Sequence, residues 1–346
     1  MVSRESIGIL STGVYLPKRV MTGREIAAAA GLPVDVVERK MGIVQKPIPG
    51  DDDHTCEMGA RAARKAIAGA GIDPETIDVV VYVGEEYKEY PVWTAGIHLQ
   101  RLVGAWRAWA FDVSQRCGTL ILGMKLAKDM MLADPSIRTV LLAGGYRNVD
   151  LVDYRNERTR FLFNLAAGAG AVILRRGLSR NAVMESHLIT DGSFSEDVVI
   201  RAGGTRMPLT AEGIARGDHL LDVPDPRGMK RRLEERSIRN FLEAIRRALD
   251  KSGYTERDID YLGILHMKRS AHERILGELG LSGDQTIYLD HYGHIGQFDP
   301  VLSLELGLRE NKIREGDLVV LVSAGIGYAW GATVIRWGEE EKQRGD

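Results

Sequence analysis

An alternation of β-prone and helical segments runs along this chain twice, and each time it closes on two consecutive strands. Apolar runs such as Val79–Val83 are continuous, which is typical of strands that are covered on both faces. Helical segments follow these runs, and helical crossovers join parallel strands. The sequence therefore predicts an α/β fold of two similar halves, with helices between and outside two mostly parallel sheets.

The join between the halves is expected at 175–180, which gives an N-terminal half of 1–175 and a C-terminal half of 181–338. In the first half, strands are expected at 6–16, 78–84, 109–113 and 138–145, with the apolar stretch 162–175 closing it, and helices at 22–30, 34–41, 56–70, 92–102 and 120–132. In the second half, strands are expected at 183–190, 259–266, 286–289, 317–323 and 329–336, and helices at 230–251, 270–279 and 297–310. A long irregular insertion is expected at 200–225.

The composition sets limits on function. The 346 residues include 44% apolar and 27% charged residues, which is ordinary for a soluble globular protein. A net charge of −2 gives no basic field for nucleic acid. Two cysteines form no disulfide framework, and no closely spaced Cys/His set predicts a metal site. No apolar run reaches membrane-spanning length and no signal-peptide core is present, so we expect a cytoplasmic protein without membrane contact.

Cys117 lies where the apolar strand 109–113 gives way to a helical pattern that starts at Leu120. Free backbone N–H groups and the helix dipole stabilise a thiolate at such a helix N-terminus. The position therefore predicts a lowered pKa and a nucleophilic thiol. The alternative interpretation is a small, buried, unreactive side chain.

Three histidines lie at the ends of second-half strands, where open α/β sheets bind ligands. His266 ends the strand 259–266, and His291 and His294 follow the strand 286–289. A cysteine that faces histidines indicates covalent acyl chemistry, with imidazoles for proton transfer or oxyanion binding. Histidines that merely hydrogen-bond within loops are the alternative.

Four motifs, in this order and spacing, resemble those of one family. They are the nucleophile segment 111–117, the strand 262–266 that ends in histidine, the turn 292–294 and the glycine-rich hairpin 316–331. On these motifs the chain from 7 to 337 resembles the thiolase superfamily, and most of all ketoacyl-acyl carrier protein synthase III. The resemblance implies a duplicated five-layer α-β-α-β-α sandwich.

The activity that the resemblance implies is a decarboxylative Claisen condensation. Cys117 would take a short acyl group from a coenzyme A (CoA) or acyl carrier protein (ACP) thioester. His266 and His294 would then direct decarboxylation of a malonyl-type thioester, whose carbanion attacks the acyl group. The acyl oxyanion would be held by the Cys117 N–H and by a backbone N–H of the loop Gly325, Ile326 and Gly327. No permanently bound cofactor is implied.

The chain departs from the family pattern at several positions. His294 stands where synthase III usually has asparagine, so the Cys-His-His set is similar to that of the elongating ketoacyl synthases. Val36 replaces a tryptophan that stacks on the CoA adenine, Lys40 replaces a neighbouring arginine, and Ala167 replaces an aspartate. These departures favour a carrier-protein donor, although CoA stays open.

Tyr90, before Pro91, matches a bulky residue that closes the acyl pocket across the dimer in the family. The resemblance therefore implies a homodimer and a short acyl group. Lys40, with Arg158 and Arg160 of the charged loop 146–160, is expected to contact the phosphopantetheine arm or a carrier protein. Acidic residues are interleaved in this loop, so an internally paired loop is an equal alternative.

A second family offers a different reaction. Glu86, in Val83-Gly84-Glu85-Glu86, matches the catalytic glutamate of 3-hydroxy-3-methylglutaryl-CoA synthase, which implies an aldol-type condensation. The favoured alternative is that Glu85 and Glu86 form a solvated loop. Acyl transfer to an oxygen or nitrogen acceptor and a catalytically silent partner subunit also stay open. Asp299 is a candidate to orient an imidazole.

Overall fold

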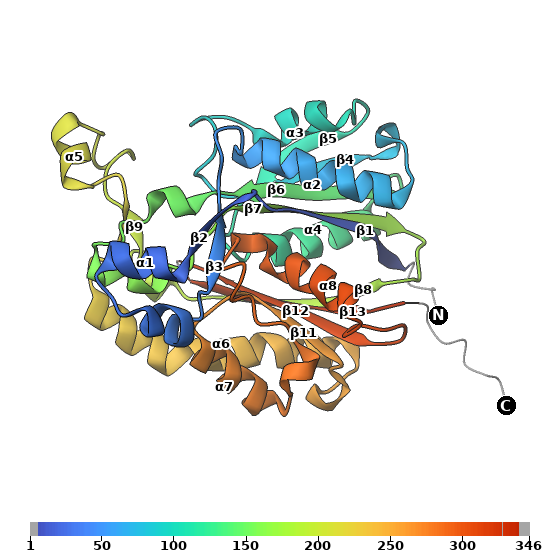
Figure 1. Ribbon diagram of the computed structural model, residues 1–346. Coiled ribbons are helices and arrows are strands. Elements are labelled where there is room, and N and C mark those ends of the chain that lie inside the picture. Colours follow the sequence, from blue (N-terminus) through green and yellow to red (C-terminus); the bar gives the residue numbers. More distant parts are fainter. Residues whose placement is uncertain (1–5, 327, 339–346) are drawn as a thin grey trace.

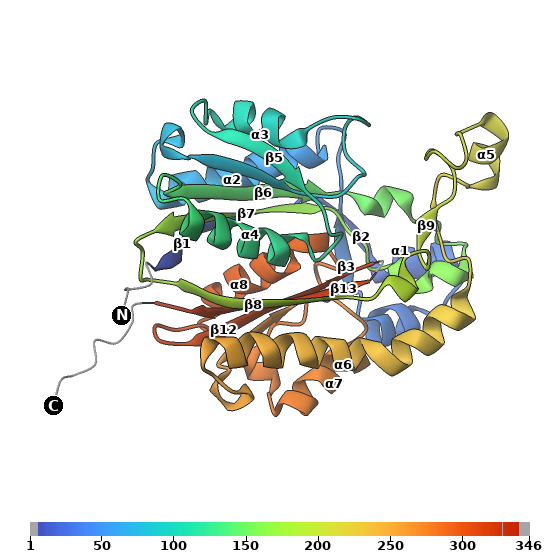
Figure 2. The same ribbon diagram turned by 180° about the vertical axis from the view of Figure 1, so that it is seen from behind.

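The structure is a computed structural model, and it describes residues 6–326 and 328–338. Five layers are stacked in it, as Figure 1 shows from the helices at the top to those at the bottom. Helices α2 and α3 cover the first sheet, α4 and α8 lie between the two sheets, and α6 and α7 cover the second. Figure 2 shows α4 in the middle layer from behind. The predicted α-β-α-β-α sandwich is confirmed.

The first half contains the outer sheet at the top of Figure 1. Its sheet strands are β1 (Ile7–Tyr15), β4 (Val79–Val83), β5 (Trp109–Val113), β6 (Thr139–Tyr146) and β7 (Gly168–Arg176). Its helices are α1 (Gly23–Ala30), α2 (Thr55–Ala70), α3 (Ala95–Val103) and α4 (Thr119–Ala133). Beside them lie a small sheet and a π-helical turn, namely β2 (Arg19–Thr22), β3 (Gln45–Ile48) and Val36–Met41.

The second half repeats this plan. Its sheet strands are β8 (Ala182–Thr190), β11 (Tyr261–Ile264), β12 (Leu318–Gly325) and β13 (Ala329–Arg336). Its helices are α6 (Pro226–Ser252), α7 (Arg269–Leu279) and α8 (Asp299–Arg309). The insertion after β8 contains β9 (Val199–Ile200), α5 (Ala211–Arg216) and β10 (Leu221–Asp222), and it projects from the body in both ribbon views.

The strand order is β11-β12-β13-β8-β1-β7-β6-β4-β5, and the two sheets meet at the single pair Gly8↔Ala182. Strand β4 runs parallel to both β5 and β6, so the carboxyl ends of these three strands lie at one edge. Strand β11 runs parallel to β12 in the second sheet. Because β7 is antiparallel to its neighbours β1 and β6, and β13 to β12 and β8, the sheets are mixed and the prediction of mostly parallel sheets is wrong. This edge of the first sheet is where the predicted nucleophile follows β5.

Helix α4 is apolar on more than one face because it packs against both sheets. Leu120, Ile121, Met124 and Met131 are all completely buried. Burying side chains of this size stabilises the fold by about 1.5–3 kcal/mol each. The nucleophile therefore precedes a helix that the two sheets hold from both sides.

Most of the predicted elements are confirmed, including the Thr22 cap of α1, which forms a capping box with Glu25. The predicted strand 286–289 is wrong. Thr286 Oγ1 donates to the Leu262 carbonyl at 2.8 Å, so a side chain, instead of a strand ladder, attaches this segment to β11. Helix α3 begins three residues later than predicted, because Val92 has a positive φ of 54° that no helix contains.

No helix in the described ranges is long and apolar enough to span a bilayer. The division at 175–180 stays a prediction; β7 ends at Arg176 and β8 begins at Ala182.

Candidate active site

Cys117 lies in the tight turn between β5 and α4. Arg116, immediately before it, has a positive φ of 53°, a conformation that costs a non-glycine residue about 1–2 kcal/mol. Hydrogen bonds hold the turn from both sides. Ser323 Oγ of β12 donates to the Cys117 carbonyl at 2.6 Å, and the Gln115 N–H donates to Thr119 Oγ1 at 2.8 Å. The second sheet thus fixes the turn that the first sheet supplies.

The thiol of Cys117 is only 2% exposed. Burial raises its pKa, His294 lowers it, and Glu85 raises it, with a net rise above the ordinary value. The prediction of a lowered pKa is therefore wrong. Helix α4 begins only at Thr119, and the desolvation of the sulfur outweighs the stabilisation that a helix terminus provides.

His294 and Asp299 form the cationic side of the site. His294 Nδ1 lies 2.5 Å from Asp299 Oδ2, and both side chains are buried. Burial lowers the pKa of His294, but the Asp299 carboxylate and Cys117 raise it by more than burial lowers it. The pKa of His294 therefore lies well above its ordinary value. Asp299 Oδ1 also accepts the Ile295 N–H at 2.7 Å. Asp299 thus orients an imidazole, as the sequence suggested.

His266 has a different environment, although it is also buried. Its Nε2 donates to the Gly42 carbonyl at 2.9 Å, and Nδ1 accepts from Asn164 Nδ2 at 2.9 Å. Burial lowers its pKa to about 4. The ring is therefore neutral, and both of its nitrogens already have partners. Its predicted role in decarboxylation stays a prediction.

Asn164, which the sequence reasoning missed, links the two histidines. Its side chain bonds His266, and its backbone carbonyl accepts the His294 N–H at 2.8 Å. The completely buried Lys46 donates to the carbonyls on either side of Asn164, those of Phe163 and Leu165, at 2.6 and 2.5 Å. Lys46 was the residue that could have pointed to Asn164, but the sequence does not show that this lysine is buried.

Two adjacent glutamates follow β4 and have opposite environments. Glu85 is buried, with Oε1 3.5 Å from Cys117 Sγ, and Asn148 Nδ2 donates to its Oε2 at 2.6 Å. The Glu86 side chain is 67% exposed and contacts Arg116 at 2.9 Å and Ser114 at 3.1 Å. The solvated-loop interpretation is therefore wrong for Glu85, and it agrees with the exposure of Glu86.

Glu85 was overlooked because it stands in a charged stretch. A signal was available, since it is the second residue after a fully buried strand, at the edge where β4, β5 and β6 end.

Tyr146, at the end of β6, completes the buried surroundings of the thiol. Its ring lies 5.8 Å from that of His294, and burial, with Cys117 and Glu85, raises its pKa well above the ordinary value. The hydroxyl is therefore protonated and able only to donate towards an anion. A Cβ at Gly296 would lie 2.2 Å from this ring, so the turn before α8 needs glycine at that position.

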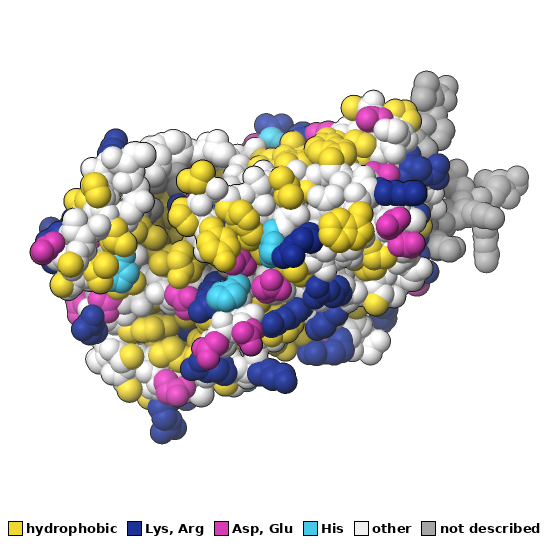
Figure 3. All heavy atoms as spheres, turned by 90° about the horizontal axis from the view of Figure 1, so that it is seen from above, with side chains coloured by type: hydrophobic (Ala, Val, Ile, Leu, Met, Phe, Trp, Pro, Cys, Tyr) yellow, Lys and Arg dark blue, Asp and Glu magenta, His cyan; other side chains and the backbone are white. Residues whose placement is uncertain are grey.

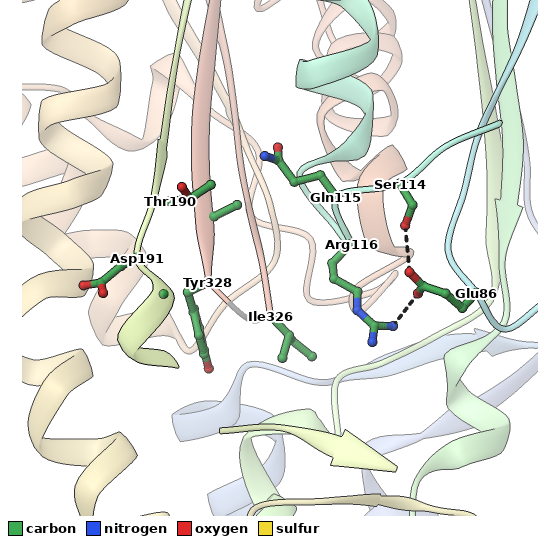
Figure 4. A pocket seen from close by; sticks show the side chains of 10 residues that line it. Glu86, Ser114, Gln115, Arg116, Thr190, Asp191, Ile326 and Tyr328 are labelled. Carbon is green, nitrogen blue, oxygen red and sulfur yellow. Dashed lines mark hydrogen bonds and ion pairs between the residues drawn. The ribbon is translucent and has the colours of Figure 1, made fainter. Parts of the chain in front are cut away.

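A pocket of about 330 Å³ opens beside the nucleophile turn. Figure 4 shows Arg116, Gln115, Ile326 and Tyr328 around it, with Arg116 bonded to Glu86. The pocket walls come from both halves, namely the turn after β5 and the ends of β8 and β13. The residues just before Cys117, Gln115 and Arg116, thus form part of the pocket wall.

The remaining predicted residues are dispersed. Tyr90 is 64% exposed and packs edge-on against Trp93, with ring centroids 5.5 Å apart. Arg160 pairs with Glu157 inside the loop at 2.6 Å, as the internally paired alternative expected, whereas Arg158 pairs at 2.7 Å with Asp222 of β10, outside the loop. Lys40 is exposed.

In the predicted oxyanion loop, Gly325 packs so closely that a Cβ would lie 3.1 Å from the Cys117 nitrogen. Ile326 lines the pocket, and Gly327 lies outside the described residues. His291 is exposed at the surface, where it pairs with Asp290. Within the described ranges, no group of three His, Cys, Asp or Glu side chains is arranged to hold a metal ion.

Known proteins are similar to this chain in sequence. A family model described as 3-oxoacyl-[acyl-carrier-protein (ACP)] synthase III matches residues 111–192, and the model of its C-terminal part matches 249–337. Beta-ketoacyl-[acyl-carrier-protein] synthase III of Symbiobacterium thermophilum is 30% identical over 337 residues, which cover 96% of this chain and 98% of that protein. The same-named protein of Caldanaerobacter subterraneus is 26% identical over 342 residues, covering 97% and 99%.

Solved structures agree on the fold. The Thermus thermophilus synthase III matches with a TM-score of 0.82 at 23% identity, covering 96% of this chain and 100% of that one. The Pseudomonas aeruginosa synthase III matches with 0.81 at 22% identity, covering 96% and 99%.

The fold is thiolase-like, and the relatives in sequence define the class as that of condensing transferases. Within that class, the chain belongs to the 3-oxoacyl-[acyl-carrier-protein] synthase III family of condensing enzymes.

Proposed function

We propose that the protein joins a short acyl group to a malonyl-type thioester through an acyl-Cys117 intermediate, as a step of fatty acid or polyketide biosynthesis. The observation that carries the proposal is a buried thiol whose pKa is lowered by His294 of the buried His294–Asp299 pair, next to Gln115 and Arg116, which line a pocket. A cationic imidazole stabilises the thiolate that attacks the donor thioester.

The second half-reaction forms the carbon–carbon bond. The malonyl carboxylate leaves as CO₂, and the electron pair of that bond attacks the acyl carbonyl. His294 and Tyr146 are donors beside the sulfur, so they stabilise the oxyanion and enolate charges that develop there. We further propose that the Cys117 N–H and a loop N–H among Gly325, Ile326 and Gly327 hold the acyl oxyanion.

The donor is proposed to be a CoA or ACP thioester, and the protein is proposed to act in the cytoplasm without a permanently bound cofactor. Lys40, Arg158 and Arg160 remain the proposed contacts for the phosphopantetheine arm, although the two arginines must first leave their carboxylate partners.

A homodimer is proposed because β5 is the edge strand of the first sheet, and an unpaired edge tends to pair with another chain. Exposed Tyr90, Val92 and Trp109 lie near or on this edge. Figure 3, which views the molecule from the side of α2 and α3, shows hydrophobic side chains gathered between charged ones. Tyr90 of each chain would then reach the partner's acyl pocket.

The test is the intact mass of the protein after it is mixed with a panel of short acyl-CoA and acyl-ACP thioesters. We expect an adduct on the natural chain and none on Cys117→Ala. The adduct should leave when a malonyl thioester is added, with release of a ketoacyl product.

Other outcomes separate the alternatives. An adduct that ignores malonyl thioesters but leaves with an acetyl thioester, a hydroxyl or an amine would replace the proposal by aldol-type condensation or by acyl transfer to oxygen or nitrogen. For the aldol route, Glu86 is poorly placed, since it faces solvent and Arg116. If no donor forms an adduct, the silent partner subunit replaces the proposal.

A further inference from the structure

Glu85 is a buried carboxyl group that contacts the nucleophile directly. Its Oε1 lies 3.5 Å from Cys117 Sγ, in the geometry of a thiol that donates to a carboxylate. Its Oε2 is held by Asn148 at 2.6 Å and faces Arg116 at 3.5 Å. One oxygen is thus anchored, and the other is aimed at the sulfur.

Three neighbouring strand ends build this contact. Glu85 follows β4, Cys117 follows β5, and Asn148 follows β6, and β4 pairs in parallel with the other two strands. The parallel pairing of these strands places the three residues side by side at one edge of the sheet. The carboxyl is therefore part of the framework that carries the nucleophile.

The titratable groups around the sulfur differ in how firmly they hold their protons. His294 is paired with Asp299 and keeps its proton, because its pKa lies well above the ordinary value. Burial raises the pKa of Glu85, whereas Arg116 and Asn148 lower it. Glu86 faces Arg116 from outside, and Tyr146 stays protonated. Among these groups, Glu85 is the carboxyl that accepts a hydrogen bond from the sulfur itself.

A carboxylate beside a thiolate is unfavourable, because two like charges in a buried site raise each other's pKa. Glu85 and Cys117 therefore tend to share one proton between them. A shared proton makes the resting thiol a weaker nucleophile. The arrangement is useful to the enzyme if the proton that the carboxyl holds takes part in the reaction.

We propose that Glu85 is a catalytic residue, which takes the proton from Cys117 Sγ during acylation and returns it during turnover, while His294 remains a fixed positive charge. The proposal rests on the acyl-Cys117 intermediate proposed above. In acylation, the S–H bond breaks and its proton moves to Glu85. The sulfur forms a bond to the donor carbonyl carbon, the donor C–S bond breaks, and the departing thiolate takes the proton from Glu85.

The second half-reaction also balances. Loss of CO₂ supplies the electron pair for the new C–C bond, and the bond between the acyl carbon and Sγ breaks with its pair on sulfur. Glu85, which gave up its proton to the departing donor thiolate, takes one proton from solvent and passes it to the Cys117 thiolate, so the thiol and the carboxylate are both restored. No oxidant, reductant or metal ion is consumed.

The experiment compares Glu85→Gln with Glu305→Gln in the full-length protein. Glu305 on α8 is a suitable control because it is a part-buried carboxyl whose pKa is raised by burial, as it is for Glu85. It accepts a hydrogen bond of 3.1 Å from Thr12 Oγ1 of β1. Two quantities are measured for each variant, the pH midpoint of Cys117 alkylation by iodoacetamide and the turnover of an acyl and a malonyl thioester.

In Glu85→Gln we expect the alkylation midpoint to fall, because the negative charge that raises the thiol pKa is gone. Turnover should nevertheless fall by about 100-fold, the lower range for loss of a general acid–base group. Glu305→Gln should change neither quantity. A variant whose thiol is alkylated more readily but whose turnover is slower has lost proton transfer. Mere disruption of the site would not produce this combination.

Each remaining outcome is decisive. If Glu85→Gln keeps normal turnover, the proton-transfer role is overturned while the acyl-enzyme stands. If turnover falls but the alkylation midpoint does not move, Glu85 only supports the turn, and the role is also overturned. If Glu85→Gln does not fold, Glu85→Asp is measured instead, and normal turnover at full thiol reactivity would overturn the role. If the natural chain forms no acyl adduct, the proposed function fails first, and this inference fails with it.

Discussion

The end of β11 and the turn before α8 each present a buried histidine, and the two rings have opposite protonation. His266 contacts a carbonyl and an amide, those of Gly42 and Asn164. His294 contacts the Asp299 carboxylate. Burial disfavours the charged form of both rings, so the partner decides the outcome. A neutral partner leaves His266 with a pKa of about 4, while a carboxylate keeps His294 protonated.

The comparison teaches that two buried histidines in one site are not interchangeable groups. The expected Cys-His-His set consists of a thiol, a neutral ring with both nitrogens occupied, and a cation. The cation is the ring that affects the pKa of Cys117. The predictions below test this difference, beginning with the largest expected effect on turnover.

Replacing His294, the cationic ring, should reduce turnover more than any other change. In His294→Ala we expect turnover to fall by about 10²–10⁴-fold, the range for loss of a positioned acid–base group. The rate of acyl-Cys117 formation in single-turnover experiments measures this loss. His291→Ala, at an exposed histidine three residues earlier, is the control. A fall of less than about tenfold would mean that the His294 charge is not needed.

Removing the carboxylate should make His294 resemble His266. Asp299→Asn takes away an opposite charge, which ordinarily lowers the pKa of its partner by about 1–3 units. Since the protonated fraction at neutral pH falls accordingly, turnover should fall by about tenfold or more. The alkaline limb of the pH–rate profile should move towards lower pH, and an unmoved limb would contradict the assignment.

The neutral histidine should affect stability against acid more than turnover. The folded-state pKa of His266, about 4, lies below the ordinary 6.5, so the unfolded chain binds a proton first as the pH falls. The contribution of the neutral His266 ring to the free energy of unfolding is therefore fully present above pH 6.5 and is lost as the pH falls towards 4. The amplitude is about 3 kcal/mol from this group.

His266→Gln preserves a donor and an acceptor without a titrating ring. It should flatten this loss of stability between pH 6.5 and 4, as measured by urea unfolding, and His291→Gln should not. If the slope is unchanged in His266→Gln, the ring is not buried in its neutral form.

The smallest effect on turnover is expected at Lys46, which holds the backbone on both sides of Asn164. Burial lowers its pKa to about 7 from 10.5. The unfolded chain therefore binds more protons between these values, and stability should rise as the pH increases from about 7 to 10.5. Lys46→Met should remove this rise in thermal unfolding experiments. A rise that persists in the variant would place the titration elsewhere.

Much of the fold followed from local patterns. Fully apolar Val79–Val83 predicted a covered strand, and Thr22 with Glu25 predicted the start of α1. The segment 286–289 failed because a four-residue apolar run does not reveal whether backbone or side chains make its hydrogen bonds. Short runs carry too little periodicity to decide between these states.

The site was predictable only where strand ends marked it. Cys117 follows such an end, whereas His294 was identified from a predicted strand, 286–289, that does not form; Asp299 lies near enough to His294 in sequence to be considered. Burial makes His266 neutral, and its hydrogen-bond partner Gly42 lies 224 residues away, so no local pattern connects the two. Glu85 and Glu86 are identical in sequence terms, and only tertiary burial separates them.

The left-handed backbone of Arg116 has a consequence for how this chain can evolve. Glycine would adopt the φ of 53° without a Cβ conflict, so a selection for heat resistance alone would favour glycine at position 116. The same change would delete the guanidinium that Glu85 and Glu86 share. Selection for thermal survival and selection for turnover would therefore drive this one codon in opposite directions.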